Sequence, residues 1–170
     1  NNYKQIGTTI DDAVGEAFDK TAKILHLGYP GGPQIEKFAK LGNKSSYNLP
    51  EPIINRAGCN LSLAGLKTAV LRKSKELSSD KEKYNLAASF QETINKILSK
   101  KTEVAMKKFR EEVSNDSLKP FVVAGGVAAN ETIRNNLREL SKKMNFNPLF
   151  PSKEFCGDNA AMIAWAGIQR

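Results

Sequence analysis

The segment 121–130 constrains the fold of this chain more than any other. It reads as a short apolar run, then Gly125 and Gly126, then Asn130 at the start of a helical pattern. The apolar run predicts a buried strand over residues 120–124. Because glycine has no Cβ, this turn lets backbone N–H groups approach a phosphate or a nucleoside closely. A strand followed by such a turn and a helix is typical of α/β domains, which bind ligands beyond the carboxyl ends of their strands.

Hydrophobic periodicity predicts the elements around this turn. Helices are expected over residues 9–26, 33–41, 65–77, 78–113, 130–144 and 159–169, and strands over residues 60–63, 120–124 and 145–150. The helix over residues 159–169 is nearly all apolar, so we expect it to be largely buried. Many helices beside few strands indicate a helix-rich α/β fold.

The net charge of +8 has two explanations. Attraction to nucleic acid is one, because Lys and Arg bind phosphates. The basic residues are spread rather than clustered, however, which favours lysine-rich helix faces in contact with solvent. Because the chain begins with Asn1 rather than methionine, we expect it to be either part of a longer protein or a processed product.

The sequence argues against several protein classes. No apolar run approaches the roughly 20 residues that a membrane-spanning helix needs. No signal peptide is recognisable in the polar first residues. Cys59 and Cys156 are far apart and form no CxxC pair, so a disulfide framework or a zinc site is not expected. His26 is the only histidine, and its place near a predicted helix end does not favour catalysis. We expect a cytoplasmic protein.

Acidic residues near the N-terminus offer a first set of candidate site residues. On a helix over residues 9–26, Asp12, Glu16 and Asp19 share one face. Such a face is often only solvated, but Gly15 stands where alanine would favour a helix by about 1 kcal/mol. A glycine there suggests close approach of a ligand or another backbone. Asp19 could then accept hydrogen bonds from ribose hydroxyls.

Three further positions each allow a structural and a functional interpretation. The turn 29–33 either only joins two helices or presents the N–H of Gly32 to a nucleotide. Asn130 either caps a helix or contacts a nucleoside. Asp158 either caps the last helix or supplies a carboxylate to a metal or beside a phosphate. The spacing of these residues leaves the alternatives open.

Taken together, these motifs resemble the tRNA N6-adenosine threonylcarbamoyltransferase family, whose members were formerly labelled O-sialoglycoprotein endopeptidases. The resemblance covers almost the whole chain. The segments that carry it are residues 10–23 (IDDAVGEAFDKTAK), 29–33 (YPGGP), 62–69 (SLAGLKTA), 87–91 (AASFQ), 123–130 (VAGGVAAN) and 158–162 (DNAAM).

The resemblance implies a fold and a set of site residues. It implies an actin-like ATPase fold (that of actin, sugar kinases and Hsp70) with two lobes, of which residues 1–170 would form a single domain, most of the C-terminal lobe, with the N-terminal lobe absent. Asp19, Gly32 and Asn130 would bind the adenylate substrate, and Asp158 would be a metal ligand. One iron (or zinc) ion per subunit would be completed by two histidines of the N-terminal lobe. Residues that could also line the substrate cleft are Glu16, Gly125 and Gly126.

The resemblance also implies an activity. The threonylcarbamoyl group of threonylcarbamoyl-AMP would be transferred to N6 of the adenosine 3′ of the anticodon, in tRNAs that read codons starting with A. Partners would be tRNA, a paralogous subunit of the same fold and, in bacteria, a small ATPase, with no membrane involved. With half of the cleft absent, the chain alone is expected to be inactive. The alternative is a non-catalytic nucleotide- or RNA-binding module. A metalloprotease is disfavoured, because the sequence has no His-Glu-x-x-His helix.

Overall fold

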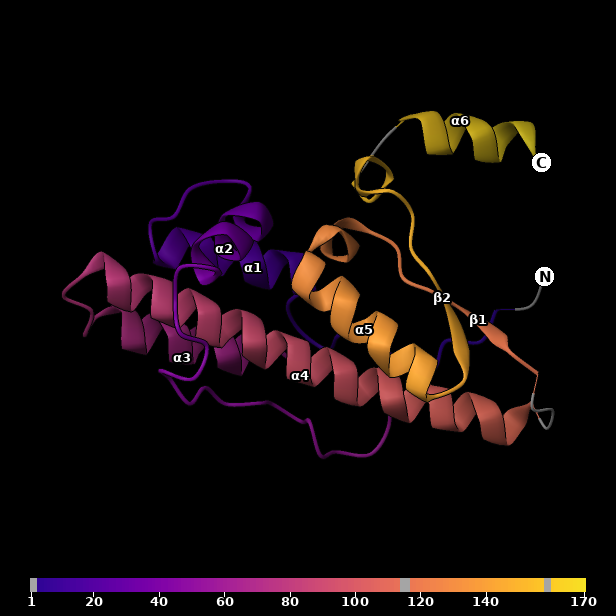
Figure 1. Cartoon of the computed structure of the whole chain (residues 1–170), viewed down its shortest axis with the longest axis horizontal. Helices are drawn as coiled ribbons and strands as arrows, with labels where there is room; N and C mark the ends of the chain where they lie inside the picture. Colours follow the sequence, from indigo (N-terminus) through magenta and orange to yellow (C-terminus); the bar gives the residue numbers. More distant parts are fainter. Residues whose placement is uncertain (1–2, 114–116, 158–159) are drawn as a thin grey trace. The chain divides into compact units, whose positions relative to one another are not determined.

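The structure, a computed structural model, describes residues 3–113, 117–157 and 160–170. The chain forms two compact units, Asn1–Asp116 and Ser117–Arg170. The first unit is helical and the second contains a small parallel sheet, as Figure 1 shows. The chain is therefore helix-rich α/β, as the sequence predicts.

The first unit is built around one long helix. This helix, α4 (Asp80–Glu112), contacts α2 (Gly31–Ala39) and α3 (Ala64–Ser74). The helix α1 (Val14–Ile24) packs in turn on α2 and α3. In the core, the fully buried ring of Phe90 and the ring of Phe18 form an edge-to-face pair with a centroid distance of 5.2 Å. Much of the apolar side of α4 is buried, and α2 packs on α4 while α1 packs on α2 (Figure 1).

The ends of α1 differ from the prediction. The helix begins at Val14 rather than near Thr9, because Thr9 forms a β-bridge with Leu61 and its hydroxyl donates to the carbonyl of Asp12 at 2.7 Å. The predicted strand over residues 60–63 is reduced to that single bridge. At the other end, α1 stops at Ile24 rather than at His26, and both His26, with φ of 56°, and Gly28, with φ of 99°, adopt left-handed backbone conformations.

The second unit contains the predicted strand–turn–helix–strand sequence. Strand β1 (Lys119–Val122) pairs in parallel with β2 (Phe146–Leu149), with Lys119 opposite Phe146. The crossover between them is α5 (Glu131–Lys143), which packs on β2 through Ile133 and Leu137. Short 3-10 turns, η1 (Gly126–Ala129) and η2 (Lys153–Phe155), precede α5 and follow β2. The prediction of two strands and one helix here is confirmed. The prediction that the first strand is buried is wrong, because no residue of β1 is buried and Val122 is 63% exposed.

The last helix, α6 (Ala160–Ile168), contradicts the prediction that it is largely buried. Every one of its residues is exposed, with Ile163 at 76% and Trp165 at 64%. An all-apolar pattern shows that side chains favour burial, but it does not supply the surface that buries them. Among the described residues, none of the helices combines the length and the apolar character needed to cross a membrane.

Candidate functional site

In the first unit, Asp19 lies in close contact with the start of α2. The Oδ1 atom of Asp19 accepts a hydrogen bond from the N–H of Gly31 at 2.7 Å. A carboxylate at a helix N-terminus satisfies an otherwise unpaired N–H and interacts favourably with the helix dipole. A Cβ on Gly31 would lie 2.4 Å from Cα of Asp19 and 2.7 Å from the carbonyl oxygen of Phe18. Only glycine therefore allows this approach.

Gly32, the next residue, has a different environment. A Cβ added there would meet no heavy atom of the described residues within 4 Å. Its N–H belongs to the first turn of α2, where backbone N–H groups have no partner within the helix. The structure therefore brings the Asp19 carboxylate and the backbone of Gly32 to one helix end, with open space beside Gly32.

The neighbouring acidic residues are engaged by the protein itself. Asp11 accepts hydrogen bonds from the N–H of Leu63 at 2.7 Å and of Ala64 at 3.3 Å, and from the Ser62 hydroxyl. It thereby caps α3 from a distant part of the chain. Burial raises the pKa of the Asp11 carboxyl, but these hydrogen bonds outweigh burial and the net pKa is lowered.

Asp12 and Glu16 do not form the acidic helix face that the sequence predicts. Asp12 precedes α1, and its carboxylate bridges two ammonium groups, Lys20 Nζ at 2.7 Å and Lys67 Nζ at 2.8 Å. Glu16, a candidate cleft residue, pairs with Lys20 at 2.6 Å and accepts a hydrogen bond from the N–H of Ala13. These contacts join α1 to α3.

The Asp12 bridge predicts a pH dependence of stability. Hydrogen bonds from Lys20 and then Lys67 lower the pKa of Asp12 below its unfolded value of about 3.9. The bridge therefore stabilises the fold above about pH 4 and is lost as the pH falls through the lowered pKa. Asp12→Asn should cost about 1 kcal/mol at neutral pH and nothing in strong acid. Urea unfolding across the pH range measures this, with exposed Glu139→Gln as control; equal losses for the two variants would contradict it.

In the second unit the predicted glycine turn directly follows the sheet. The strand pairing continues past β1, with the N–H of Val123 donating to the carbonyl of Leu149 at 3.0 Å. Gly125 then adopts φ of 88°, a left-handed conformation that favours glycine. Gly126 is exposed, and a Cβ there would meet no described atom within 4 Å. Backbone groups of this turn are therefore accessible to a ligand.

Asn130 ends the turn and caps α5. Its Oδ1 atom accepts a hydrogen bond from the N–H of Ile133 at 3.1 Å, and the residue is only 7% exposed. Asn130 therefore caps α5, which is the structural one of its two interpretations. The side-chain amide carries two further N–H donors, so capping does not exclude a contact with a nucleoside.

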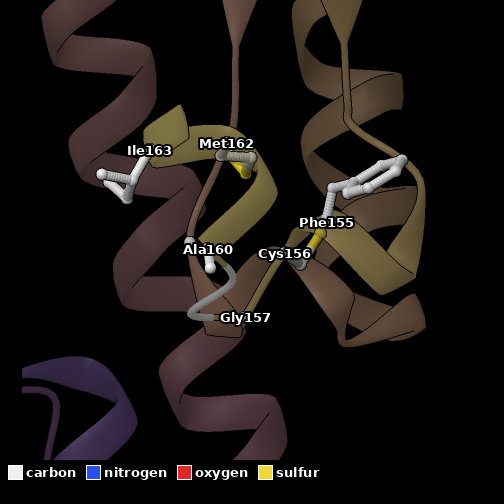
Figure 2. Close-up of a pocket in the computed structure, with 7 residues that line it drawn as sticks. Phe155, Cys156, Gly157, Ala160, Met162 and Ile163 are labelled. Atoms are coloured by element: carbon white, nitrogen blue, oxygen red, sulfur yellow. The ribbon is translucent and has the colours of Figure 1, made fainter. Parts of the chain in front are cut away.

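A largely apolar pocket of about 540 Å³ lies beside the glycine turn. Figure 2 shows Phe155 and Cys156 around it together with Met162 and Ile163 of α6. The complete lining is Gly125, Phe155, Cys156, Gly157, Ala160, Met162 and Ile163. Apolar pockets with nearby backbone polar groups suit flat or apolar ligand parts. The sequence motifs did not indicate Phe155 and Cys156, which directly precede Gly157.

The remaining candidates divide as follows. Asp19, Gly32 and Glu16 belong to the first unit, and the glycine turn with Asn130 belongs to the second. Asp158, the predicted metal ligand, lies outside the described residues. Among residues 3–113, 117–157 and 160–170, no group of three or more His, Cys, Asp or Glu side chains is placed to hold a metal ion.

Comparison with known proteins gives one family. A family model described as tRNA N6-adenosine threonylcarbamoyltransferase matches residues 1–165. A protein of that name from Pelagibacter ubique (strain HTCC1062) is 57% identical over 169 residues, which cover 99% of this chain and 47% of the relative. One from Rickettsia rickettsii (strain Sheila Smith) is 49% identical over 171 residues, covering 99% and 49%. The chain thus spans about half the length of the curated relatives it matches.

Proposed function

This chain belongs to the tRNA N6-adenosine threonylcarbamoyltransferase family, and we propose that the protein containing it transfers a threonylcarbamoyl group to N6 of an adenosine in tRNA. The observation that carries this proposal is the extent of the family match. It runs over residues 1–165 and so includes every candidate site residue, from Glu16 to Asp158. The activity is proposed for the intact protein rather than for the chain alone.

The proposed donor is threonylcarbamoyl-AMP, and the proposed acceptor is the adenosine 3′ of the anticodon in tRNAs that read codons starting with A. The N6 amine attacks the carbonyl carbon of the donor. A carbon–nitrogen bond forms, the bond from that carbon to the phosphate oxygen breaks, the amine loses a proton, and AMP leaves. Holding the two reactants in position supplies much of the rate enhancement in such a step.

Asp19 and Gly32 are proposed to bind the adenylate in the first unit. Their shared place at the N-terminus of α2 supports this, because a helix N-terminus favours anions and presents unpaired N–H groups. One oxygen of Asp19 accepts from Gly31. A carboxylate has capacity for further hydrogen bonds, so Asp19 can also accept from ribose hydroxyls.

In the second unit, Asn130, Gly125 and Gly126 are proposed as adenylate-binding residues. The accessible backbone of the glycine turn supports this role, as does the adjoining apolar pocket, which suits the face of a base. The fold we propose is most of the C-terminal lobe of an actin-like ATPase, a single domain in the sense of that family.

We further propose that Asp158 helps to bind one iron or zinc ion. A carboxylate is a suitable ligand for either metal, and two histidines from elsewhere in the protein are proposed to complete the site, since the described residues include no group of three or more His, Cys, Asp or Glu side chains placed to hold a metal ion. When bound, the metal would polarise the donor carbonyl. The proposed role of the described residues is to bind the adenylate donor and to orient it for attack by the amine.

The proposed partners follow from the same family. They are tRNA, a paralogous subunit of the same fold and, in bacteria, a small ATPase, all in the cytoplasm. The net charge of +8 supports contact with tRNA phosphates, although it does not identify the surface involved.

The test is a transfer assay with the intact protein and its partner proteins. Threonylcarbamoyl-AMP is the donor, and the acceptors are a tRNA with adenosine 3′ of the anticodon and a matched tRNA with guanosine there. We expect modified adenosine, detected by mass spectrometry, and AMP release only with the first tRNA. Asp19→Asn, which keeps an oxygen for the Gly31 N–H, should lower kcat/KM at least about tenfold.

The alternative, a non-catalytic RNA-binding module, predicts a different result. It predicts steeply salt-dependent tRNA binding without modification of either tRNA. That result with wild-type protein and all partners present would overturn the proposed function.

A further inference from the structure

We propose that Arg134 is a positioning residue that ties the glycine turn to the segment 151–157 and so sets the shape of the adjoining pocket. The inference rests on the proposed function for its catalytic consequence, but its structural part stands on the contacts of the second unit. Arg134 lies in α5, one turn after the Asn130 cap, and is half-buried.

Three contacts of one guanidinium carry the proposal. The Nε atom donates to the carbonyl of Ala128 at 2.8 Å, and Ala128 is buried within η1. The Nη2 atom donates to the carbonyl of Pro151 at 2.9 Å, just after β2. The same Nη2 lies 3.3 Å from Sγ of Cys156, which is 3% exposed. One side chain thus joins two segments that are separate in the sequence.

The guanidinium of Arg134 also lies over the ring of Phe150. Cζ of Arg134 lies 5.1 Å from the ring centroid, a distance at which a cation is attracted to an aromatic face. The planar, forked guanidinium donates in these directions from N–H groups held in a fixed arrangement, whereas the three donors of a lysine ammonium share one nitrogen at the end of a flexible stem. Arg134 is therefore suited to hold a geometry rather than only to carry charge.

The hydrogen bonds of Arg134 affect the pocket because both segments that they join contribute to its lining. Gly125, at the start of the glycine turn, lines it from one segment, and Phe155, Cys156 and Gly157 line it from the other. Arg134 itself is not part of the lining. Its effect on a bound adenylate must therefore pass through the backbone of the turn and of the segment 151–157.

Arg138 offers a matched control in the same helix. Its Cζ also lies 5.1 Å from the centroid of Phe150. Its side chain, however, donates to Asn135 Oδ1 at 2.7 Å, within α5, rather than to the turn. Like Arg134→Met, Arg138→Met removes one positive charge and one cation contact with the Phe150 ring. Unlike Arg134→Met, it leaves the hydrogen bonds to the carbonyls of Ala128 and Pro151 in place.

The experiment compares Arg134→Met, Arg134→Lys and Arg138→Met in the intact protein. If the hydrogen bonds of Arg134 hold the two segments together, both Arg134 variants should speed hydrogen exchange in residues 125–130 and in residues 151–157, while Arg138→Met should not. Both should raise the KM for threonylcarbamoyl-AMP about tenfold, and Arg138→Met should stay within about twofold of wild type. Should Arg134→Met fail to fold, Arg134→Lys, which keeps the charge, carries the test.

The outcomes separate the two proposals. Unchanged exchange in either segment, or a KM equal to that of Arg138→Met, would overturn the positioning role of Arg134. A KM defect that disappears at a lower temperature, where the variant is as fully folded as wild type, would also overturn it, because stability alone would then explain the loss. If wild-type protein transfers nothing, the proposed function fails, and the exchange measurement still decides whether the tie exists.

Discussion

Phe90→Ala should lower the free energy of unfolding of the first unit by about 4 kcal/mol, because truncating a buried aromatic side chain loses its burial and leaves a cavity. Phe90 lies in α4 and is fully buried, and the substitution also removes its edge-to-face contact with Phe18. Since Asp19 and α2 are held on this core, the candidate site should loosen as well. Urea unfolding of the intact protein, with hydrogen exchange in residues 14–39, measures both effects.

Phe109→Ala is the control for this prediction. It removes the same side chain from the same helix, but Phe109 is 40% exposed. We expect a loss below about 1 kcal/mol, as for other partly exposed positions. Similar losses for the two variants would show that Phe90 is not the centre of the core.

Much of the fold could be predicted because its signals are local. The period of apolar residues gave α4 almost to its ends, and Ser79 marks its start by accepting a hydrogen bond from the N–H of Glu82. The glycine pair after an apolar run likewise predicted β1, the turn and α5. Elements with strong periodicity and a clear cap are therefore predictable from a single sequence.

The errors arise where distant residues decide the structure. Asp11 accepts hydrogen bonds at the N-terminus of α3, and Thr9 forms the bridge with Leu61, so the predicted helix could not extend to residue 9. The apolar pattern of α6 correctly indicated side chains that favour burial, yet its residues are exposed in the described structure. Neither result is encoded in a local window of sequence.

The candidate site shows the same division. The family resemblance indicated that Asp19, Gly32 and Asn130 are binding residues. It did not indicate that Asp19 accepts a hydrogen bond from the N–H of Gly31. Arg134 was missed because an arginine in an amphipathic helix has the same pattern as one on a solvated face. Its role becomes visible only when Ala128 and Pro151 are brought to the same guanidinium.

Gly31→Ala should destabilise the first unit by about 3 kcal/mol, although alanine is the better helix former. The new Cβ would lie 2.4 Å from Cα of Asp19 and 2.7 Å from the carbonyl oxygen of Phe18, and both are backbone atoms that cannot simply rotate away. The start of α2 would have to move, which also breaks the hydrogen bond from Gly31 to Asp19. Urea unfolding measures the loss.

Gly32→Ala, one residue later, separates stability from binding. The described residues place no heavy atom within 4 Å of the added Cβ, so the free energy of unfolding should stay the same or rise by up to about 1 kcal/mol. If Gly32 presents its N–H to an adenylate, the methyl group instead occupies the space of the ligand, and affinity for AMP should fall about tenfold. Titration calorimetry of the intact protein with AMP measures this. Unchanged affinity would remove Gly32 from the binding site, whereas a stability loss as large as that of Gly31→Ala would show that α2 begins in a packed environment.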